Sequence, residues 1–353
     1  MDAFDWQSTF SLNDLPVTVQ TPPIKSALIK SVPEDFFVFE KPKYTASGTG
    51  NHLYLWVRKR DISGGDLLRI ISGSLKINQK LIGTAGTKDR RAITFQWVSI
   101  PREYSGRLRF LDHPDISILK TTPGRNKIKT GHLWGNRFVV RLRGVDSPDI
   151  EGIAHAVRLL KTQGFPNLFG TQRFGINGSN LWLGLDLLEQ AGYGKQKRIS
   201  PFKRRMAISA VQSAVFNHYC RQRTKIGLDR IIPGDVMMKE SGGIFWSDDP
   251  LTDQVRLETG ELGITGPLPG TRMFQPMHES ALFEKSVIEA SGMSADTFRP
   301  FARIAAGTRR KLLVKPKDLG FRICGNNVEL SFFLPPGSYA TVMLRELVSV
   351  LNT

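Results

Sequence analysis

The pattern of apolar and polar positions over the first hundred residues predicts strands around one helix. Apolar and polar residues alternate over residues 23–60, interrupted by a turn rich in glycine and serine at residues 45–51. Apolar residues then recur at helical spacing over residues 61–75, and the stretch ITFQWVSI, which ends at Ile100, returns to the pattern of a strand. We therefore expect a helix flanked by a sheet.

Strands and helices also mix further along the chain. Strands are expected at residues 110–119 and 137–143, and an amphipathic helix at residues 149–163. The C-terminal segment predicts a hairpin around Gly325-Asn326-Asn327, a turn at residues 335–337 and then a closing helix. Because no strict βαβ repeat runs through these elements, the pattern indicates an α+β fold.

The amino-acid composition of the sequence changes at Gly164. The stretch GFPNLFGTQRFGINGSN is dense in glycine and asparagine and precedes a helical stretch, LWLGLDLLEQAG. Ser200-Pro201 then marks the start of a long helix, and residues 227–276 are rich in loops and β-like. Since the C-terminal segment shares its β character with the N-terminal region, we expect one domain to be inserted into another.

Charge narrows the class of partner. The 353 residues include 49 lysines and arginines against 32 acids, which gives a formal net charge of +17. Such a surplus indicates a polyanion, and neither a basic amphipathic helix nor a polybasic tail points to a membrane surface. We therefore expect a nucleic acid as the partner.

The sequence carries no signal for a metal site or for export. The two cysteines, Cys220 and Cys324, are far apart, and the six histidines have no metal-binding spacing. The N-terminus lacks the basic and apolar pattern of a signal peptide, and no apolar run approaches about 20 residues. We expect a cytoplasmic protein without a metal and without a membrane partner.

The glycine-rich stretch LIGTAGTKDRRAITFQWVSI at residues 81–100 raises the question of a phosphate-binding loop. A Walker loop requires G-x-x-x-x-G-K-[ST], but Gly86 is followed by Thr87, and Lys88 by Asp89. A dinucleotide fingerprint fails as well, because the strand–loop–helix context and the downstream acid are absent. The loop therefore does not predict a phosphate cradle.

What the loop does present is one carboxylate among bases. Lys88, Arg90 and Arg91 flank Asp89, and neighbouring cations favour the ionised form of an aspartate. From these residues alone, Asp89 is either a surface ion-pair residue or a nucleophile or base in an RNA-binding cleft.

The stretch GTAGTKDRRAITFQWVSI resembles the catalytic segment of the TruD family of tRNA pseudouridine synthases, A-G-x-K-D-x-x-A-x-T-x-Q. Further stretches resemble the family in the expected order, namely PEDFFVFE (33–40), GHLWGNRF (131–138), PNLFGTQRFG (166–175), SAVQSAVFN (209–217), AGTRRKLLV (306–314) and LPPGSYATVMLREL (334–347). The resemblance implies a catalytic domain with a mixed, largely antiparallel sheet, formed by residues 1–163 and 312–353. It also implies an inserted α+β TRUD domain formed by residues 164–311.

The resemblance further implies a reaction. Family members isomerise uridine to pseudouridine in tRNA without a cofactor, in bacteria usually at uridine 13, and Asp89 would be the catalytic nucleophile. Whether the carboxylate adds to the ribose, adds to the base or removes a proton to give a glycal stays open. We expect a monomer with tRNA as its partner.

Further residues would bind the substrate, whose target base must leave its stack to reach the carboxylate. The candidates that the resemblance and the neighbouring sequence indicate are Lys30, Phe36, Lys88, Asn136, Phe138 and Tyr339. Family members carry phenylalanine at the position of Tyr339. From the residues alone, Phe36 is equally a core residue of a buried strand, Asn136 a turn residue and Lys30 a solvated lysine.

Three basic runs are expected to follow an RNA backbone. They consist of Lys195, Lys197, Arg198, Lys203, Arg204 and Arg205; of Arg125, Lys127, Lys129 and Arg137; and of Arg303, Arg309, Arg310, Lys311, Lys315 and Lys317. The motif PNLFGTQRFG either binds phosphate through Gln172 and Arg173 or braces the junction of the inserted domain.

Two other functions compete with the synthase. A member that has lost activity would bind or fold RNA with the same basic surface, but the intact Asp89 argues against it. An RNA methyltransferase would need a nucleotide-binding glycine motif after its first strand, and the sequence has none.

Overall fold

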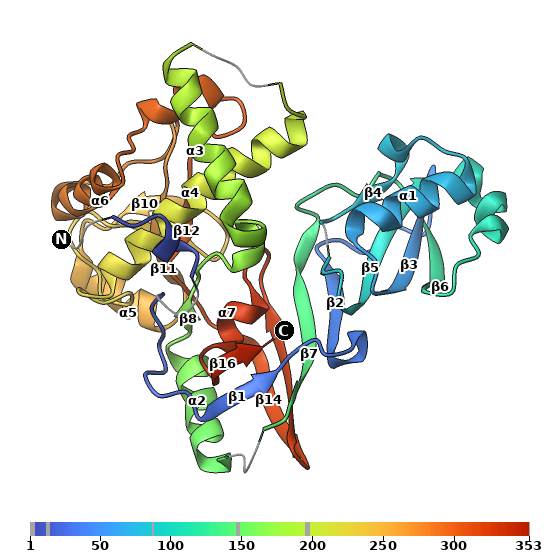
Figure 1. Ribbon diagram of the computed structural model, residues 1–353, viewed down its shortest axis with the longest axis horizontal. Coiled ribbons are helices and arrows are strands. Elements are labelled where there is room, and N and C mark those ends of the chain that lie inside the picture. Colours follow the sequence, from blue (N-terminus) through green and yellow to red (C-terminus); the bar gives the residue numbers. More distant parts are fainter. Residues whose placement is uncertain (1–3, 12–14, 87, 146–148, 195–197, 353) are drawn as a thin grey trace. The chain divides into compact units, whose positions relative to one another are not determined.

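The computed structural model describes residues 4–11, 15–86, 88–145, 149–194 and 198–352 (Figure 1). The chain forms two compact units, each built from several segments. We call them the helical unit (Met1–Gln20, Thr162–Lys315 and Thr341–Glu346) and the sheet unit (Thr21–Lys161, Pro316–Ala340 and Leu347–Thr353).

The units differ from the expected domain bounds at residues 1–20 and 341–346, and by a few residues at 162–163 and 312–315, which all belong to the helical unit. Hydrogen bonds join residues 1–20 to residues 341–346. The Glu346 carboxylate accepts from the backbone N–H groups of Thr18 (2.9 Å) and Val19 (2.8 Å), and Arg345 donates to the carbonyl of Leu15. Which ranges act as the catalytic and the inserted domain stays a prediction.

A mixed, largely antiparallel sheet forms the sheet unit, as predicted for an α+β fold. Its main path runs β14-β15-β7-β2-β5-β3-β6, and on this path only β2 and β5 pair in parallel. Outside the path, β1 pairs with β16 and with β7, and β4 pairs with β5. The strands are β1 (Ile24–Leu28), β2 (Phe36–Pro42), β3 (His52–Arg60), β4 (Gly83–Thr84), β5 (Ile93–Pro101), β6 (Ile116–Gly124), β7 (Leu133–Arg143), β14 (Lys317–Cys324), β15 (Asn327–Leu334) and β16 (Val348–Asn352).

One helix, α1 (Gly64–Leu75), covers a face of β3 and β5 (Figure 1). Its Leu67, Ile71 and Leu75 are fully buried in a cluster with apolar side chains of both strands. Alternate residues of β3 are buried, because successive side chains of a strand point to opposite faces. The helix and the alternating strands therefore confirm the predicted helix beside a sheet. The second helix, α2 (Ile150–Thr162), confirms the amphipathic helix expected at residues 149–163.

The strand expected at residues 110–119 was placed wrongly. A 3-10 helix occupies Arg102–Phe110, and β6 begins only at Ile116. A turn separates the two, in which the backbone N–H of Ile116 donates to the carbonyl of His113. This turn delays the start of the strand.

The closing helix is shorter than predicted. Helix α7 spans only Ala340–Leu344, and the chain then forms β16. This strand pairs in parallel with β1, which brings Val348 opposite Ile24. The pairing partner is more than 300 residues away in the sequence, so the local apolar spacing did not reveal the strand.

Helices surround a small sheet in the helical unit. The elements are α3 (Ser179–Gly192), α4 (Pro201–Arg223), α5 (Pro250–Glu258) and α6 (His278–Ala290), the sheet β10-β9-β11-β12 (Ile244–Trp246, Val236–Lys239, Leu262–Leu268 and Thr308–Lys311) and the pair β8 (Phe165–Pro166) with β13 (Leu313–Val314). As predicted, α4 begins after Ser200, whose hydroxyl accepts from the backbone N–H of Lys203. Helix α5, capped by Asp249, lies within the stretch that the sequence indicated as rich in loops.

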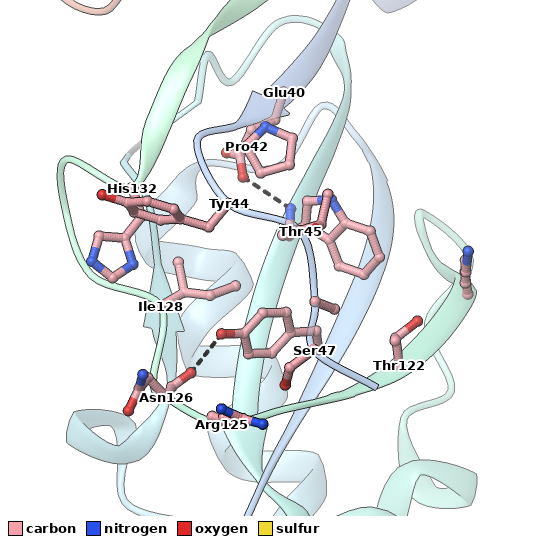
Figure 2. A pocket seen from close by; sticks show the side chains of 14 residues that line it. Glu40, Pro42, Tyr44, Thr45, Ser47, Thr122, Arg125, Asn126, Ile128 and His132 are labelled. Atoms are coloured by element: carbon pink, nitrogen blue, oxygen red, sulfur yellow. Dashed lines mark hydrogen bonds between the residues drawn. The ribbon is translucent and has the colours of Figure 1, made fainter. Parts of the chain in front are cut away.

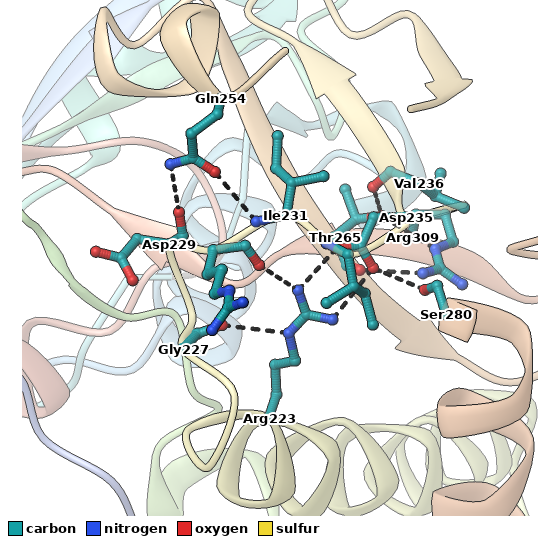
Figure 3. A network of polar contacts seen from close by, with 12 residues as sticks. Arg223, Gly227, Asp229, Ile231, Asp235, Val236, Gln254, Thr265, Ser280 and Arg309 are labelled. Carbon is teal, nitrogen blue, oxygen red and sulfur yellow. Dashed lines mark hydrogen bonds and ion pairs between the residues drawn. The ribbon is translucent and has the colours of Figure 1, made fainter. Parts of the chain in front are cut away.

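A buried ion pair joins the end of α4 to the rest of the helical unit (Figure 3). The guanidinium of Arg223 donates to both carboxylate oxygens of Asp235 and to the carbonyls of Gly227 and Arg230. Asp235 also accepts from the hydroxyl of Ser280 on α6, at 2.7 Å. Because the guanidinium nitrogens all have acceptors, the buried charge is compensated, as a stable buried pair requires.

Candidate active site

Asp89 lies in the loop between β4 and β5, and its carboxylate is held by Lys30. The Lys30 Nζ atom lies 2.8 Å from Asp89 Oδ2, and the two side chains are 9% and 28% exposed. Thr87, two residues earlier, lies outside the described residues. The ion pair therefore leaves one side of a fixed carboxylate open to a substrate.

Lys30 follows β1 in an unusual backbone conformation. Its φ angle is 53°, in the left-handed region that non-glycine residues rarely adopt. The side chain is buried, and its Nζ atom lies 4.1 Å from the centre of the Phe36 ring. The ammonium thus contacts both the ring and the Asp89 carboxylate, a cation–π contact and an ion pair at once. Strained residues of this kind persist where the surrounding structure fixes them, often at functional sites.

The two predicted phenylalanines lie in the core beneath Lys30. Phe36 on β2 is fully buried, and its ring packs edge-on against that of Phe138 on β7 at 5.9 Å. Phe138 in turn stacks on Phe332 of β15 at 5.2 Å. In this structure Phe36 contacts Lys30 and Phe138 packs against Phe36, so a direct contact of either ring with an extruded base stays a prediction that requires the ring to become exposed.

A second buried lysine, Lys59, was missed by sequence reasoning. It lies on the buried face of β3, and its Nζ atom donates to the carbonyls of Ile62 (2.6 Å) and Asp89 (2.7 Å). Burial lowers the pKa of Lys59 to about 8, although the nearby Asp89 carboxylate acts in the opposite direction. Lys59 thus holds the main chain of the loop that carries Asp89. The alternation of β3 was the signal, since it put a lysine at a core position.

Lys88 is beside Asp89 in the chain, but its ammonium contacts Glu40 of β2. The Lys88 Nζ and Glu40 Oε2 atoms lie 2.7 Å apart, and the side chains are 3% and 1% exposed. Glu40 also accepts from the backbone N–H of Trp97 on β5. The pair fixes the loop to two strands, and Glu40 balances the charge that we expected Lys88 to add to the site. A contact of Lys88 with substrate stays a prediction.

Asn136 lies in the middle of the sheet with an unsatisfied acceptor. On β7 it is opposite Glu40 of β2 and Leu334 of β15. Its Oδ1 atom is buried and has no hydrogen-bond partner among the described residues. Since buried polar atoms are nearly always paired, this oxygen is a candidate for a substrate contact. Tyr339 lies partly exposed between β15 and α7.

The motif PNLFGTQRFG packs against two other stretches that resemble the family. The side-chain amide of Asn217 exchanges hydrogen bonds with the backbone of Phe169, and the Arg310 guanidinium donates to Asn167 and lies 4.1 Å from the centre of the Phe169 ring. Arg173 donates to the hydroxyl of Ser213. These contacts hold the motif within the helical unit, and both phosphate binding and the bracing of the junction of the inserted domain stay predictions.

Not every member of the basic runs is available to RNA. Arg309 is buried and forms an ion pair with Glu284 at 2.8 Å, which corrects its expected role. Lys195 and Lys197 lie outside the described residues, whereas Arg198, Lys203 and Arg205 are exposed. Among the described residues, no group of three or more histidine, cysteine, aspartate or glutamate side chains is placed to hold a metal ion. The described helices include none that is both long and apolar enough to cross a membrane.

The chain is strongly basic, and it holds an acidic residue with a lysine on a loop that is bound to the middle of a mixed sheet. These features indicate an RNA-modifying enzyme as the class of protein. Comparison with known proteins narrows this class. A family model described as tRNA pseudouridine synthase D (TruD) matches residues 14–192 and 196–347.

Curated relatives and a solved structure agree with this match. A tRNA pseudouridine synthase D of Anaeromyxobacter dehalogenans (strain 2CP-C) is 36% identical over 343 residues, covering 95% of this chain and 97% of the relative. Another, from Thermus thermophilus, is 37% identical over 341 residues, covering 95% and 92%. A crystal structure of a TruD protein from Methanosarcina mazei superposes with a TM-score of 0.74 over 99% of both chains and, at 24% identity, shows the shared fold. The chain therefore belongs to the TruD family of tRNA pseudouridine synthases, which are isomerases.

Proposed function

We propose that this protein isomerises uridine 13 of tRNA to pseudouridine, with Asp89 as the catalytic nucleophile. The observation that carries the proposal is a partly exposed carboxylate, fixed through its side chain by Lys30 and through its main chain by Lys59. Membership of the TruD family supports the reaction, and the resemblance of the K-D loop supports the role of the aspartate. The enzyme would act as a monomer in the cytoplasm, where tRNA is modified.

The main chemical group that the reaction requires is one positioned carboxylate. The bond between N1 of uracil and C1′ of the ribose breaks, the bond between C5 and C1′ forms, and a proton moves from C5 of the base to solvent while N1 gains one. Since atoms and charge balance, no external cofactor is needed. Lys30 holds Asp89 Oδ2, which leaves Oδ1 for the ribose or the base. The same geometry serves all three chemical routes, because each needs an ionised carboxylate against the nucleoside.

Asn136, which lies opposite the partner of Lys88, Glu40, would favour a uracil over a cytosine. Asn136 Oδ1 is an acceptor without a partner among the described residues, and uracil carries an N3–H donor that cytosine lacks. A site built to pair with such a donor discriminates strongly against a base without it. Asn136 would therefore select uracil, and the net charge of +17 would attract the RNA backbone.

The test compares wild type with Asp89→Asn on unmodified tRNA, with pseudouridine mapped nucleotide by nucleotide. We expect the variant to lose at least about a thousandfold in rate while it still binds tRNA, because the amide cannot act as a nucleophile. Asp112→Asn, an exposed aspartate, is the matched control and should keep wild-type activity. Product formed by Asp89→Asn would refute the catalytic role. Binding without product in the wild type would instead favour an RNA-binding protein that has lost its chemistry.

A further inference from the structure

A pocket of about 630 Å³ opens in the sheet unit, and its lining includes neither Asp89 nor Lys30 (Figure 2). Glu40 and Pro42 lie at one end of the pocket, and Arg125 and Asn126 lie at the other. The lining comes from four strands, β2, β3, β5 and β6, and from the connections between β2 and β3 and between β6 and β7. A volume of this size is typical of sites for small ligands and is large enough for one nucleotide.

Aromatic rings make up much of the lining. The rings of Tyr54 on β3 and Trp97 on β5 lie 6.4 Å apart, and Tyr44 meets His132 edge-on at 5.6 Å. Figure 2 shows Tyr44 beside His132. Nucleobases stack on rings of this kind with little preference among bases. The lining is therefore suited to a planar, partly apolar ligand.

The aromatic wall is held in place by specific contacts. The Tyr54 hydroxyl donates to the carbonyl of Asn126 at 2.7 Å, and burial raises the pKa of Tyr54, so the donor stays protonated. Gly124 of β6 lies so close to the same ring that a β-carbon at this position would overlap with it. The ring thus needs a glycine beside it, and the wall exists before any ligand binds.

Two connections link the pocket to the catalytic loop. Glu40 lines the pocket and pairs with Lys88, the residue before Asp89. The backbone N–H of Gly131, next to the lining residue His132, donates to the carbonyl of Ala85 in the same loop. A ligand in the pocket would therefore contact Glu40, whose partner Lys88 directly precedes the nucleophile Asp89.

The charge on the lining fits a phosphodiester. Lys120 and Arg125 line the pocket, are exposed, and form no ion pair within the described part of the chain. Glu40, the carboxylate on the lining, is neutralised by Lys88. The lining residues lie on strands and loops, without the helix N-terminus that commonly binds the dianionic phosphate of a free nucleotide. Exposed cations at two separate positions of the lining suit the singly charged phosphates of an RNA backbone.

We propose that this pocket holds a second unstacked nucleotide of the RNA whose target uridine reaches Asp89. This proposal rests on the proposed function. The base lies against Tyr54 and Trp97, and the RNA backbone on either side of it passes Lys120 and Arg125. Occupation of the pocket adds affinity for RNA that is already distorted around the target, so the pocket selects among RNAs and takes no part in the chemistry.

The first test fills the pocket. Ala46→Trp places a large ring on the lining from a surface connection, and Thr49→Trp adds the same ring to the same connection outside the lining. We expect Ala46→Trp to weaken equilibrium binding of an unmodified tRNA transcript about tenfold and to raise KM similarly with kcat within about twofold. Thr49→Trp should behave as wild type, and equal thermal midpoints would show that both variants fold. Equal binding by both variants would overturn the proposal.

The second test identifies the nucleotide. Transcripts with a single abasic site at each unpaired position near the target are bound to wild type and to Ala46→Trp. One position should cost wild type about tenfold in affinity and cost Ala46→Trp nothing further, since the pocket is already filled. If every abasic effect adds to that of Ala46→Trp, the pocket holds no base of the RNA.

Two outcomes distinguish this proposal from the proposed function and from a site for a free nucleotide. Because the readout is binding, a wild type that makes no pseudouridine would refute the proposed function while the comparison of affinities still decides the pocket. The four nucleoside 5′-monophosphates are also titrated alone. Competition by one of them for RNA binding at micromolar concentration, without any position that responds in the abasic series, would assign the pocket to a free nucleotide and overturn the proposal.

Discussion

At the scale of single residues, the site depends on lysines that do different work. Lys30 contacts the carboxylate of Asp89, whereas Lys59 contacts only its carbonyl. Lys88 is neutralised by Glu40. Three ammonium groups near one aspartate would repel one another in a less buried arrangement, and here each has an oxygen partner of its own. Their contributions are therefore separable by substitution.

Lys59 makes the activity depend on pH. Because its pKa is about 8, the ammonium loses its charge as the pH rises through 8, and its hold on the Asp89 carbonyl weakens. We expect kcat/KM to fall above pH 8 in wild type. Lys59→Met keeps the length of the side chain, removes the donors and should lower kcat/KM about tenfold or more without a decline at pH 8.

Stability should respond in the opposite direction. Folding lowers the pKa of Lys59 from its ordinary value of 10.5, so the native state favours the neutral amine, and the contribution of Lys59 to the free energy of unfolding rises between about pH 8 and 10.5. A pH–rate profile and urea unfolding at matched pH values measure both trends. A profile of Lys59→Met that still falls at pH 8 would assign the decline to another group.

At the scale of elements, helices with a clear apolar stripe and strands with clear alternation were predictable. The sequence predicted β3, α1, α2 and α4, because their patterns are local. It missed β16, since the partner of that strand is β1, and it placed β6 too early. Long-range pairing overrides local spacing, and no single window of sequence contains it.

The site was predictable to a similar degree. Asp89 and Lys30 emerged from the motif and its neighbourhood, and the structure brings them together. Glu40 did not emerge, because only the folded sheet brings β2 against the loop before β5. Arg309 was misjudged for the same reason, since its partner Glu284 comes from a helix 25 residues earlier in the chain. Charge is readable from sequence, but whether a charge is already paired is a property of the fold.

Two glycines in helices should respond to alanine in opposite ways. Gly184 on α3 lies so close to α4 that a β-carbon would overlap with the carbonyl of Ala207, whereas Gly73 on α1 has open space around it. Gly184→Ala should therefore lower the free energy of unfolding by about 1–3 kcal/mol through overpacking. Gly73→Ala, the matched control, should raise it by roughly 0.5–1 kcal/mol, because alanine favours the helix.

Urea unfolding of the two variants and wild type measures these changes. If Gly184→Ala proves as stable as wild type, the close approach of α3 and α4 does not constrain that position.

At the scale of the whole molecule, a buried carboxylate helps to join segments from the two ends of the sequence. Glu346 is buried, and burial raises its pKa to about 7 although Thr18 and Val19 donate to it. Its folded pKa therefore exceeds its ordinary value of 4.5. The contribution of Glu346 to the free energy of unfolding is therefore fully present below about pH 4.5 and is lost as the pH rises through 7.

Glu346→Gln should remove this dependence. The amide oxygen still accepts from the two backbone N–H groups but carries no charge to bury, so the variant should be about 1–3 kcal/mol more stable than wild type at pH 8 and equal to it near pH 4. Unfolding by urea across this pH range measures the difference. Glu151→Gln, an exposed glutamate, serves as the control. A constant difference between Glu346→Gln and wild type at all pH values would mean that Glu346 does not titrate in this range.

The pairing of β1 with β16 has a consequence for the time at which the enzyme becomes active. The backbone N–H of Ile29, the residue before Lys30, donates to the carbonyl of Asn352. During synthesis, Lys30 leaves the ribosome hundreds of residues before the strand that holds its neighbour. A nascent chain can thus carry every side chain of the site while β1 still lacks its partner. Completion of the site therefore waits for β16, which follows β1 by more than 300 residues in the chain.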